Sequence, residues 1–351
     1  MNRLKDWFLL FRPWSYTATL VPFLVGGAVA IGAYPRCEHA FMRWLLGVFA
    51  GLLFQATVNL LNTWGDERSG VDAVPGAIRT TPQVHEGKVS MHAILSVAAC
   101  CLVLAVAIGV SLCFYREEIR PEHLGNWEFC TSLLAAGIVG ALGSINYSTG
   151  IKFKYRGLGV PFVSFLMGPL EIFVAFAIAA PNEADGLLCE LLDSFKCIVH
   201  LGSGGMSPLK LAIFLGMLIL VMLPVALLVG AIMHGNDMRD ISTDRAAGIV
   251  TLASWLGPRR ALGYYCFCHV APYVVVIALC AMHFIFLRVN GGAWLLLPCL
   301  ALPLSVRTMR RAVGVYRENP ASPAWRGLER GTGLVHLVFG VLYAAALFIV
   351  A

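Results

Sequence analysis

The sequence has few charged residues. Lys, Arg, Asp and Glu together make up 13% of the 351 residues, against about 25% in typical soluble domains. Hydrophobic residues make up 58% of the chain, and this composition excludes a soluble globular enzyme and a disordered chain. The formal net charge of +6 does not indicate a nucleic-acid-binding protein, because the basic residues are not clustered in one soluble module.

The sequence also lacks the short segments of alternating polarity that are typical of transmembrane β-barrels. Its apolar residues form continuous runs instead, each about as long as the roughly 20 residues that a helix needs to cross a bilayer. We therefore expect an all-α, polytopic membrane protein that forms one domain over residues 1–351. The runs predict nine transmembrane helices, at residues 14–34, 44–65, 92–115, 130–150, 158–180, 210–234, 262–287, 292–306 and 332–351.

Basic residues are scarce on one side of the predicted spans. The N-terminus and the loops that follow spans two, four, six and eight hold most of the 26 Lys and Arg. The opposite side holds only Arg36, Arg43, Arg116, Arg120, Lys196, Lys210 and Arg288. Because cytoplasmic loops are enriched in Lys and Arg, this asymmetry predicts a cytoplasmic N-terminus and an external C-terminus. We expect the protein in the inner (cytoplasmic) membrane of the cell.

Several kinds of catalytic site are missing as well. No Ser/His/Asp or Cys/His arrangement typical of nucleophilic catalysis is apparent, and no spacing of Cys and His indicates a zinc site. Most of the 11 cysteines lie inside predicted spans, where cysteine acts as a small apolar residue. The sequence therefore points away from a protein nucleophile and from zinc.

Two predicted spans end in polar residues that a lipid-facing helix should not carry. In each, an Asn is followed four residues later by an Asp, with a further Asp beyond it. The residues are Asn62, Asp66 and Asp72 after span two, and Asn236, Asp240 and Asp244 after span six. Residues four apart lie on one face of a helix, and the two clusters are separated by four spans. We therefore expect both clusters at the cytoplasmic side, facing one site.

The four aspartates of this site would repel one another unless a cation lay between them. Carboxylate and amide oxygens suit Mg²⁺, which often binds through one or two carboxylates together with substrate phosphates. Two Mg²⁺ ions and a diphosphate would bring the charge close to balance if Arg79 and Lys152, in neighbouring cytoplasmic loops, also contributed. The sequence thus predicts a site for a diphosphate and magnesium, with no protein nucleophile.

Other interpretations of these residues exist. A charged residue at a cytoplasmic helix end is usually just solvated, and we adopt this interpretation for Glu67, Arg68 and Asp237. The repeated Asn-x-x-x-Asp spacing favours a functional site over chance. A secondary transporter, with the Asn and Asp residues as a cation path, is the alternative from another class, although transporter sites usually lie near the bilayer midplane.

These motifs resemble those of the UbiA superfamily of intramembrane aromatic prenyltransferases, which has nine transmembrane helices and aspartate-rich motifs after the second and sixth. Within it, the sequence is most similar to the 1,4-dihydroxy-2-naphthoate polyprenyltransferase branch, which acts in menaquinone synthesis. The residues that carry the resemblance are Arg12-Pro13, Asn59 to Asn62, Gly70 to Asp72, Tyr147, Lys152, Tyr155 to Gly159, Gly168 to Leu170, Asn236 to Asp244, Ala247-Gly248, Thr251-Leu252 and Leu256-Gly257.

The resemblance implies a role for each candidate residue. Asn62, Asp66, Asp72, Asn236, Asp240 and Asp244 would hold two Mg²⁺ ions on the diphosphate of a polyprenyl donor in the lipid bilayer. Arg79 and Lys152 would neutralise charge on the leaving diphosphate. Asn59 and Tyr147 would contact the donor, and Tyr155 and Arg156 would contact the aromatic acceptor, whose ring attacks the allylic cation.

Three positions depart from the family pattern. The amide that matches Asn62 is usually followed by an aspartate, but Thr63 stands here. The glycine that matches Gly248 is followed by Ile249 instead of the lysine of the naphthoate branch, and Val160 replaces a usual acidic residue. The last two departures bear on the acceptor. The alternatives are 4-hydroxybenzoate, another naphthoate or homogentisate, with the same diphosphate chemistry.

Overall fold

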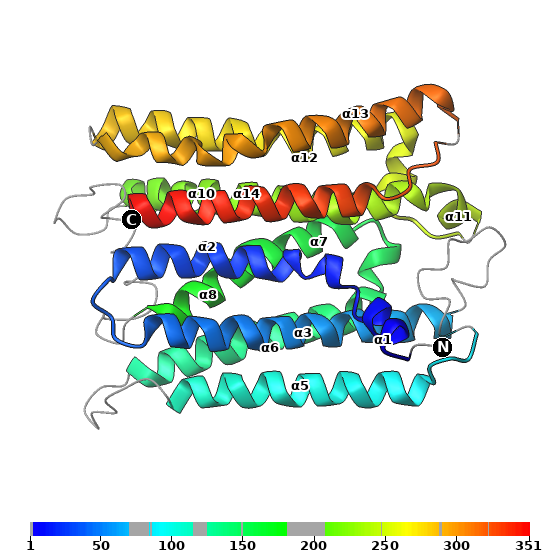
Figure 1. Ribbon diagram of the computed structural model, residues 1–351, viewed down its shortest axis with the longest axis horizontal. Helices are drawn as coiled ribbons and strands as arrows, with labels where there is room; N and C mark the ends of the chain where they lie inside the picture. Colours follow the sequence, from blue (N-terminus) through cyan, green and yellow to red (C-terminus); the bar gives the residue numbers. More distant parts are fainter. Residues whose placement is uncertain are drawn as a thin grey trace.

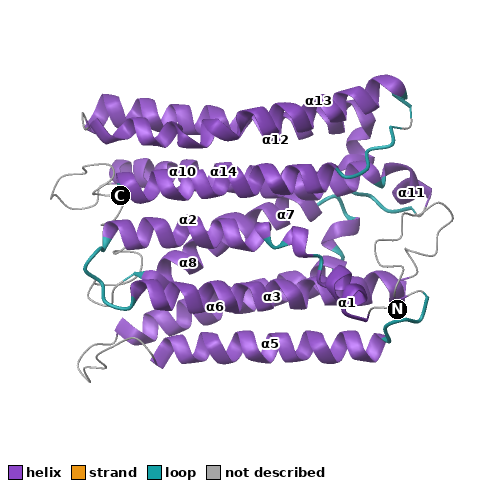
Figure 2. Cartoon of the chain, viewed as in Figure 1, coloured by secondary structure: helices purple, strands orange, loops and turns teal. Residues whose placement is uncertain are grey.

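The computed structural model describes residues 3–69, 84, 86–114, 125–148, 150–180, 208–246, 248–287, 290–321 and 323–351. These residues are almost entirely helical (Figure 2). Within these ranges, the β-type pairing is limited to one isolated bridge, between Arg156 and Val250. The prediction of an all-α protein is confirmed.

The helices lie roughly along one common axis (Figure 1). The first half of the chain forms α1 (Arg3–Phe11), η1 (Pro13–Ser15), α2 (Thr17–Ala33), α3 (Ala40–Ser69), α5 (Met91–Phe114), α6 (Gly125–Ser148) and η3 (Phe153–Tyr155). The second half forms α7 (Gly159–Phe165), η4 (Leu166–Leu170), α8 (Glu171–Ala179), α10 (Pro208–Arg239), α11 (Ile241–Ala246), α12 (Leu252–Met282), η5 (His283–Leu287), η6 (Asn290–Ala301), α13 (Leu302–Glu318) and α14 (Leu328–Val350). The two termini lie at opposite ends of the bundle (Figure 1), as an odd number of crossings requires.

Each of the nine predicted spans coincides with an apolar helix. Seven helices within the described ranges are long and apolar enough to cross a membrane, at Ala40–Gly65, Met91–Cys113, Gly159–Ala179, Leu215–Arg239, Leu252–Ile285, Gly291–Glu318 and Leu328–Val350. Leu4–Ser15 and Thr17–Ala33 form an eighth candidate that is bent by 47°. The predicted fourth span matches a shorter apolar helix, Thr131–Tyr147. The protein is thus a multi-pass membrane protein.

The seventh and eighth spans are longer than hydropathy predicts. The seventh begins at Leu252, and the eighth continues to Glu318. Several arginines expected in loops therefore lie on helices, namely Arg259 and Arg260 on α12 and Arg307, Arg310, Arg311 and Arg317 on α13. These arginine side chains are exposed. A helix can continue beyond the hydrocarbon when its charged side chains reach the polar interface, so a hydropathy window underestimates its length.

Small residues allow the central helices to approach closely. A Cβ atom on Gly340 of α14 would overlap the side chain of Val21 in α2, and one on Gly26 would overlap the backbone of Ile172 in α8. Van der Waals packing through small residues is a main source of helix association where lipid replaces water. These contacts place α2 between α14 and α8, at the centre of the bundle.

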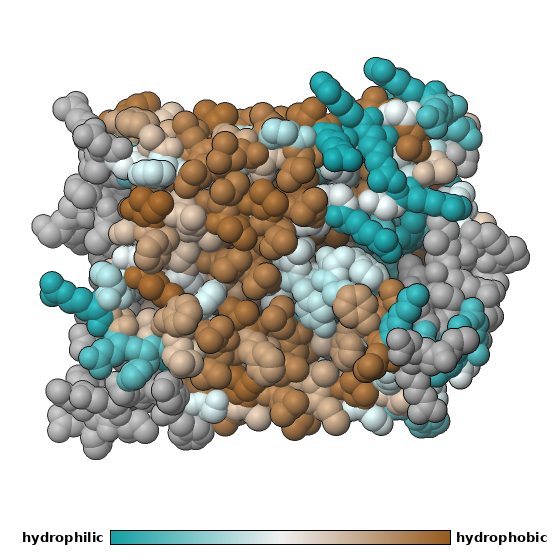
Figure 3. Space-filling model, viewed as in Figure 1, coloured by the Kyte–Doolittle hydropathy of each residue, from teal (hydrophilic) through white to brown (hydrophobic). Residues whose placement is uncertain are grey.

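A broad apolar band surrounds the middle of the bundle, with hydrophilic side chains gathered toward the ends (Figure 3). Large hydrophobic residues are exposed on its outer helices, such as Val103, Leu104 and Val106 on α5 and Phe267 and Val274 on α12. Exposed apolar surface of this extent is costly in water but suits the hydrocarbon of a bilayer. The band is therefore the lipid-facing surface.

The fifth span contains an irregular turn. The π-helical segment η4 includes Gly168 and Pro169, and proline cannot donate the backbone hydrogen bond that an α-helix needs. Gly168 packs closely on Ala226 of α10. After this turn, Glu171 points its Oε1 atom toward Thr19 Oγ1 at 3.2 Å, and the same hydroxyl lies 3.2 Å from Gln55 Oε1. A buried polar contact thus links α2, α3 and α8.

Candidate active site

The C-terminal ends of α3 and α10, which carry the two predicted motifs, lie at the same end of the bundle (Figure 1). The short helix α11 and the N-terminal helix α1 also lie at this end. The charge asymmetry predicts this end to be cytoplasmic. The position of both motifs agrees with the expectation that they face one side.

The second motif keeps the helical spacing that its sequence predicts. Asn236 lies in the last turn of α10, and Asp244 lies in α11. The backbone N–H of Asp240 donates to the Asn236 carbonyl oxygen at 3.2 Å, and that of Asp244 donates to the Asp240 carbonyl oxygen at 2.8 Å. Because this four-residue repeat continues past the end of α10, the three side chains follow one another along one side of the chain.

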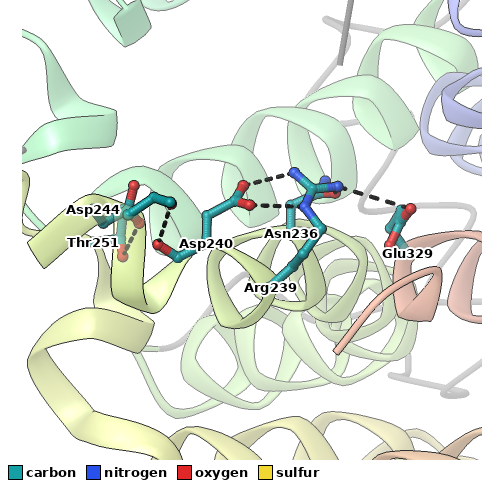
Figure 4. A network of polar contacts seen from close by, with 7 residues as sticks. Asn236, Arg239, Asp240, Asp244, Thr251 and Glu329 are labelled. Atoms are coloured by element: carbon teal, nitrogen blue, oxygen red, sulfur yellow. Dashed lines mark hydrogen bonds and ion pairs between the residues drawn. The ribbon is translucent and has the colours of Figure 1, made fainter. Parts of the chain in front are cut away.

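Arg239 lies at the centre of the polar network (Figure 4). Its Nε donates to Asp240 Oδ1 at 2.8 Å and its Nη2 donates to Asp240 Oδ2 at 2.6 Å. Its Nη1 donates to Asn236 Oδ1 at 3.2 Å and lies 3.8 Å from Glu329 Oε1 in the first turn of α14. Such paired charge-assisted bonds are the strong ones among protein hydrogen bonds.

Asp244 is held by the turn that follows α11. Gly248 adopts a positive φ of 69°, which glycine accepts without strain, and the Ile249 N–H donates to the Asp244 carbonyl oxygen at 2.8 Å. Thr251 then donates its hydroxyl to Asp244 Oδ2 at 3.0 Å while it caps α12 together with Ser254. The cap therefore fixes the position of the carboxylate.

The electrostatic surroundings of Asp244 favour its neutral form. Burial raises the pKa of Asp244 to about 6, and the negative charge of Asp240 adds to this effect. The hydrogen bond from Thr251 and the positive charges of Lys154 and Arg239 act in the opposite direction. A divalent cation would favour the charged form, because it would offset the carboxylate charge.

The interpretation of Asp237 as a solvated helix-end residue is wrong. Only 8% of this residue is exposed. It points inward from α10, close enough to interact electrostatically with Asp240, Asp244 and Lys154. The sequence placed it correctly at the end of a span, but it could not show that the neighbouring loops cover that end.

The first motif is described in part. Asn62 is partly buried on α3, and the helix includes Asp66 and ends at Ser69. The side chain of Asp66, together with Asp72 and Arg79, lies outside the described residues. These positions therefore stay predictions.

Asn59 has its hydrogen-bonding groups engaged within the protein. Its Nδ2 donates to the Phe11 carbonyl oxygen and to Ser15 Oγ, both at 2.9 Å, and its Oδ1 accepts from Gln55 Nε2 at 3.3 Å. Arg12 nearby donates to Thr63 Oγ1 at 3.2 Å. These contacts tie the segment between α1 and α2 to α3. Asn59 thus positions the N-terminal segment beside the first motif.

The loop after α6 brings several candidate residues toward the second motif. Arg156 is exposed, and its backbone pairs with Val250, directly before Thr251. Lys152 adopts a positive φ of 59° and its side chain is exposed. Lys154 is half-buried, with its ammonium group 5.4 Å from the centre of the Tyr155 ring, and it lowers the pKa of Asp244. Tyr147 is buried in the core beneath this loop.

Sequence reasoning selected Lys152 and missed Lys154, Arg239 and Glu329. Lys154 carried a usable signal, because its cationic side chain follows the same span as Lys152. Arg239 was visible as a basic residue within the second motif. Glu329 gave no signal, since only the packing of α14 against α10 brings it to the site.

Comparison with known proteins identifies the family. The profile of the UbiA prenyltransferase family matches residues 19–326. The chain belongs to this family. As a member of the UbiA family, it is a prenyltransferase, and the transporter alternative loses its support.

Relatives and solved structures agree with this assignment. The chain is 29% identical to the "UbiA prenyltransferase domain-containing protein 1" of Mus musculus, over 97% of this chain and 83% of the relative, and 28% identical to the Drosophila melanogaster homolog, over 98% and 79%. Its fold is similar to an apo UbiA homolog from Aeropyrum pernix K1 (TM-score 0.61, 17% identity, 93% and 96% coverage). It is also similar to a UbiA homolog from Archaeoglobus fulgidus bound to GPP and Mg²⁺ (TM-score 0.53, 16% identity, 97% and 99% coverage).

These relatives carry a general UbiA name rather than the name of the naphthoate branch. The resemblance to that branch therefore extends only to the UbiA family. The acceptor has to be argued from the residues that face the site.

The second UbiA motif offers oxygen atoms alone, from two carboxylates and an amide, which is the donor chemistry that Mg²⁺ prefers. Arg239 supplies a positive charge to Asp240, which marks a place that attracts a cation. Within the described ranges, no group of three or more His, Cys, Asp or Glu lies close enough to hold a metal ion. The residues fit Mg²⁺ if the first motif and a substrate diphosphate complete the ligand set.

Proposed function

We propose that the protein transfers a polyprenyl group from a polyprenyl diphosphate to 1,4-dihydroxy-2-naphthoate, with release of diphosphate, as a step of menaquinone biosynthesis. The observation that carries this proposal is the second motif, where Asn236, Asp240 and Asp244 follow one another at the end of α10. This arrangement of oxygen donors suits a magnesium diphosphate at the mouth of an apolar bundle.

In the proposed reaction, the bond between prenyl C1 and the diphosphate oxygen breaks, and a carbon–carbon bond forms between C1 and the aromatic ring. The ring loses one proton, and the bonding electrons of the broken bond leave with diphosphate. Bound Mg²⁺, with two ions expected, would stabilise the charge of the leaving group. Asn62, Asp66, Asp72, Asn236, Asp240 and Asp244 would hold it.

Cationic side chains of the chain itself would help the diphosphate to leave. We assign this role to Arg79 and Lys152 from the sequence. Lys154 adds a half-buried positive charge beside Asp244, where it is better placed to act on a group bound at the second motif. Preorganised charges of this kind account for a large part of catalysis at such sites.

The acceptor side of the proposal concerns Tyr155 and Arg156. Arg156 is exposed at the same end as the second motif, and its backbone pairs with Val250. A guanidinium suits the carboxylate of a naphthoate, because its planar N–H groups match the two oxygens. An acceptor with the same carboxylate and hydroxyl chemistry, such as 4-hydroxybenzoate, or another naphthoate or homogentisate, would use the same diphosphate site.

We further propose that the protein lies in the inner (cytoplasmic) membrane with its N-terminus in the cytoplasm. The clustering of exposed arginines at the end that carries both motifs supports this orientation, since basic residues are retained on the cytoplasmic side. Examples are Arg307, Arg310 and Arg311 on α13. The site would then open to water-soluble diphosphate and acceptor, while the prenyl chain lies among the helices.

The test is an assay in detergent micelles with radiolabelled polyprenyl diphosphate, with and without Mg²⁺. The acceptors are 1,4-dihydroxy-2-naphthoate, other dihydroxynaphthoates, 4-hydroxybenzoate and homogentisate. A prenylated 1,4-dihydroxy-2-naphthoate formed only with Mg²⁺ is the expected result. Product on another ring would move the protein to another pathway, and product formation without divalent metal would overturn the magnesium site.

A further inference from the structure

Arg239 lies between two carboxylates that it contacts unequally (Figure 4). Its guanidinium makes two hydrogen bonds to Asp240, with one to each carboxylate oxygen. Its contact with Glu329 is longer, at 3.8 Å between Nη1 and Oε1. The arginine is only 11% exposed and Glu329 only 12%, whereas Asp240 is 28% exposed. The more accessible carboxylate is therefore the one that is fully engaged.

Glu329 retains unused hydrogen-bonding capacity. Its Oε2 atom is buried and has no hydrogen-bond partner among the described residues. A buried acceptor without a partner is unfavourable, so a second arrangement that satisfies it is expected to be accessible. Gly235, one helical turn before Arg239, packs on the backbone of Leu328 and Glu329. This close packing of α10 on α14 keeps the glutamate within reach of the guanidinium.

The double contact to Asp240 conflicts with metal binding there. A cation that binds Asp240 needs at least one of the two oxygens that Arg239 occupies. The displaced guanidinium would carry a buried positive charge and would need another carboxylate. Glu329 is that carboxylate, because it already lies 3.8 Å away and has a spare oxygen.

We propose that Arg239 and Glu329 are positioning residues for the metal site: Arg239 holds Asp240 in the metal-free protein and shifts to Glu329 when a divalent cation takes Asp240. This inference rests on the proposed role of Asp240 as a metal ligand. The second motif then has two arrangements, which differ in the partner of one arginine. Its negative charge stays balanced both before and after the metal binds.

The proposal predicts opposite effects of the two residues on metal affinity. In Arg239→Gln, the oxygens of Asp240 are released, and the dissociation constant for Mn²⁺ should fall about three- to tenfold, as the loss of a partly exposed charge-assisted pair would give. In Glu329→Gln, Arg239 loses its alternative partner, and Mn²⁺ should bind several-fold more weakly. Arg239→Lys keeps the charge but cannot form the two parallel bonds, so its affinity should lie between the wild type and Arg239→Gln.

The experiment measures binding of Mn²⁺ alone to the full-length purified protein by electron paramagnetic resonance of the free ion. The variants are Arg239→Gln, Glu329→Gln, the double variant, and Arg310→Gln as a control for loss of one exposed arginine at the same end. Thermal unfolding in micelles identifies the variants that fold. If Arg239→Gln does not fold, Arg239→Lys and Glu329→Asp provide the same comparison.

The double variant decides between a shift and a general effect of charge. If Glu329 acts through Arg239, Glu329→Gln should have no further effect in the Arg239→Gln background. Independent, additive effects of the two changes would overturn the proposal, and so would unchanged affinity in Arg239→Gln. Asp240→Asn separates this failure from failure of the proposed function, since wild-type Mn²⁺ binding in Asp240→Asn would contradict the metal role itself.

Discussion

The backbone of Arg156 pairs with the backbone of Val250 in a parallel bridge. This bridge connects the loop after α6 with the loop after α11. Val250 directly precedes Thr251, whose hydroxyl holds Asp244. A residue assigned to the acceptor is therefore mechanically connected to a residue assigned to the metal, through two residues of backbone.

This connection leads to a prediction about acceptor binding. Arg156→Ala leaves the backbone bridge in place but removes the guanidinium, so the KM for the aromatic acceptor should rise about tenfold or more. The affinity for the prenyl diphosphate should change little. Steady-state kinetics with naphthoate and homogentisate, which carry their carboxylates in different positions, measure this effect. An equal loss with every acceptor and a weaker donor affinity would contradict the assignment.

The carboxylates of the two motifs should be required for turnover with any acceptor. We expect Asp66→Ala and Asp240→Ala to lower the rate at least about 100-fold, because charge on the leaving diphosphate is no longer offset. The assay with radiolabelled polyprenyl diphosphate measures the rate, and gel filtration in micelles checks folding. Glu318→Ala changes an exposed acid at the end of α13 and should retain activity. Near-normal turnover in a folded Asp240→Ala protein would refute the metal assignment.

The raised pKa of Asp244 predicts a pH dependence of stability without metal. The pKa is 3.8 in the unfolded reference and about 6 in the folded protein, so the folded state binds more protons between these values. The free energy of unfolding contributed by this group should therefore fall as the pH rises from about 4 to about 6 and stay constant above that range.

Thermal unfolding in EDTA between pH 4.5 and 7.5 checks this dependence, with Asp244→Asn as the matched variant that cannot ionise. The stability of the variant relative to the wild type should increase with pH over the titration range. Parallel curves for the two proteins would show that Asp244 does not titrate there. Added Mg²⁺ should bind more tightly as the pH rises through 6, because it favours the ionised carboxylate.

Close packing between α2 and α14 gives a prediction about stability. Gly340→Ala would place a methyl group where Val21 lies, and overpacking of this kind costs about 1–3 kcal/mol. Gly314→Ala is the control, since no atom lies within 4 Å of a Cβ at that position. Thermal unfolding of both variants in the same detergent makes the comparison. Val21→Ala should restore part of the loss in the Gly340→Ala background, and its failure to do so would argue against this contact as the cause.

Hydropathy and charge predicted much of the fold. The positions of all nine helical segments followed from apolar runs, because a chain in lipid must satisfy its backbone hydrogen bonds within each helix. The lengths of the seventh and eighth spans did not follow, since Arg259 and Arg310 lie on helices that extend past the apolar core. A scale that scores residues one at a time cannot detect a helix that continues with its charged side chains exposed.

The site was predictable in its local part. The spacing of Asn236, Asp240 and Asp244 along the chain predicted their common side, because helical geometry alone fixes it. Asp237 was misjudged, since its burial depends on neighbouring segments. Lys154 was passed over for Lys152 because the two differ in their orientation, and the backbone of the loop sets that orientation.

The sequence by itself determined that this chain spans a membrane with α-helices, that two polar motifs lie at one end, and that their chemistry suits a magnesium diphosphate. These features depend on local composition and on spacing within one helix. Only the tertiary structure decided which cation meets Asp240 and which loop meets Asp244. The contacts Arg239–Glu329 and Arg156–Val250 join segments far apart in the chain, and such contacts arise from the packing of whole helices, which no local pattern encodes.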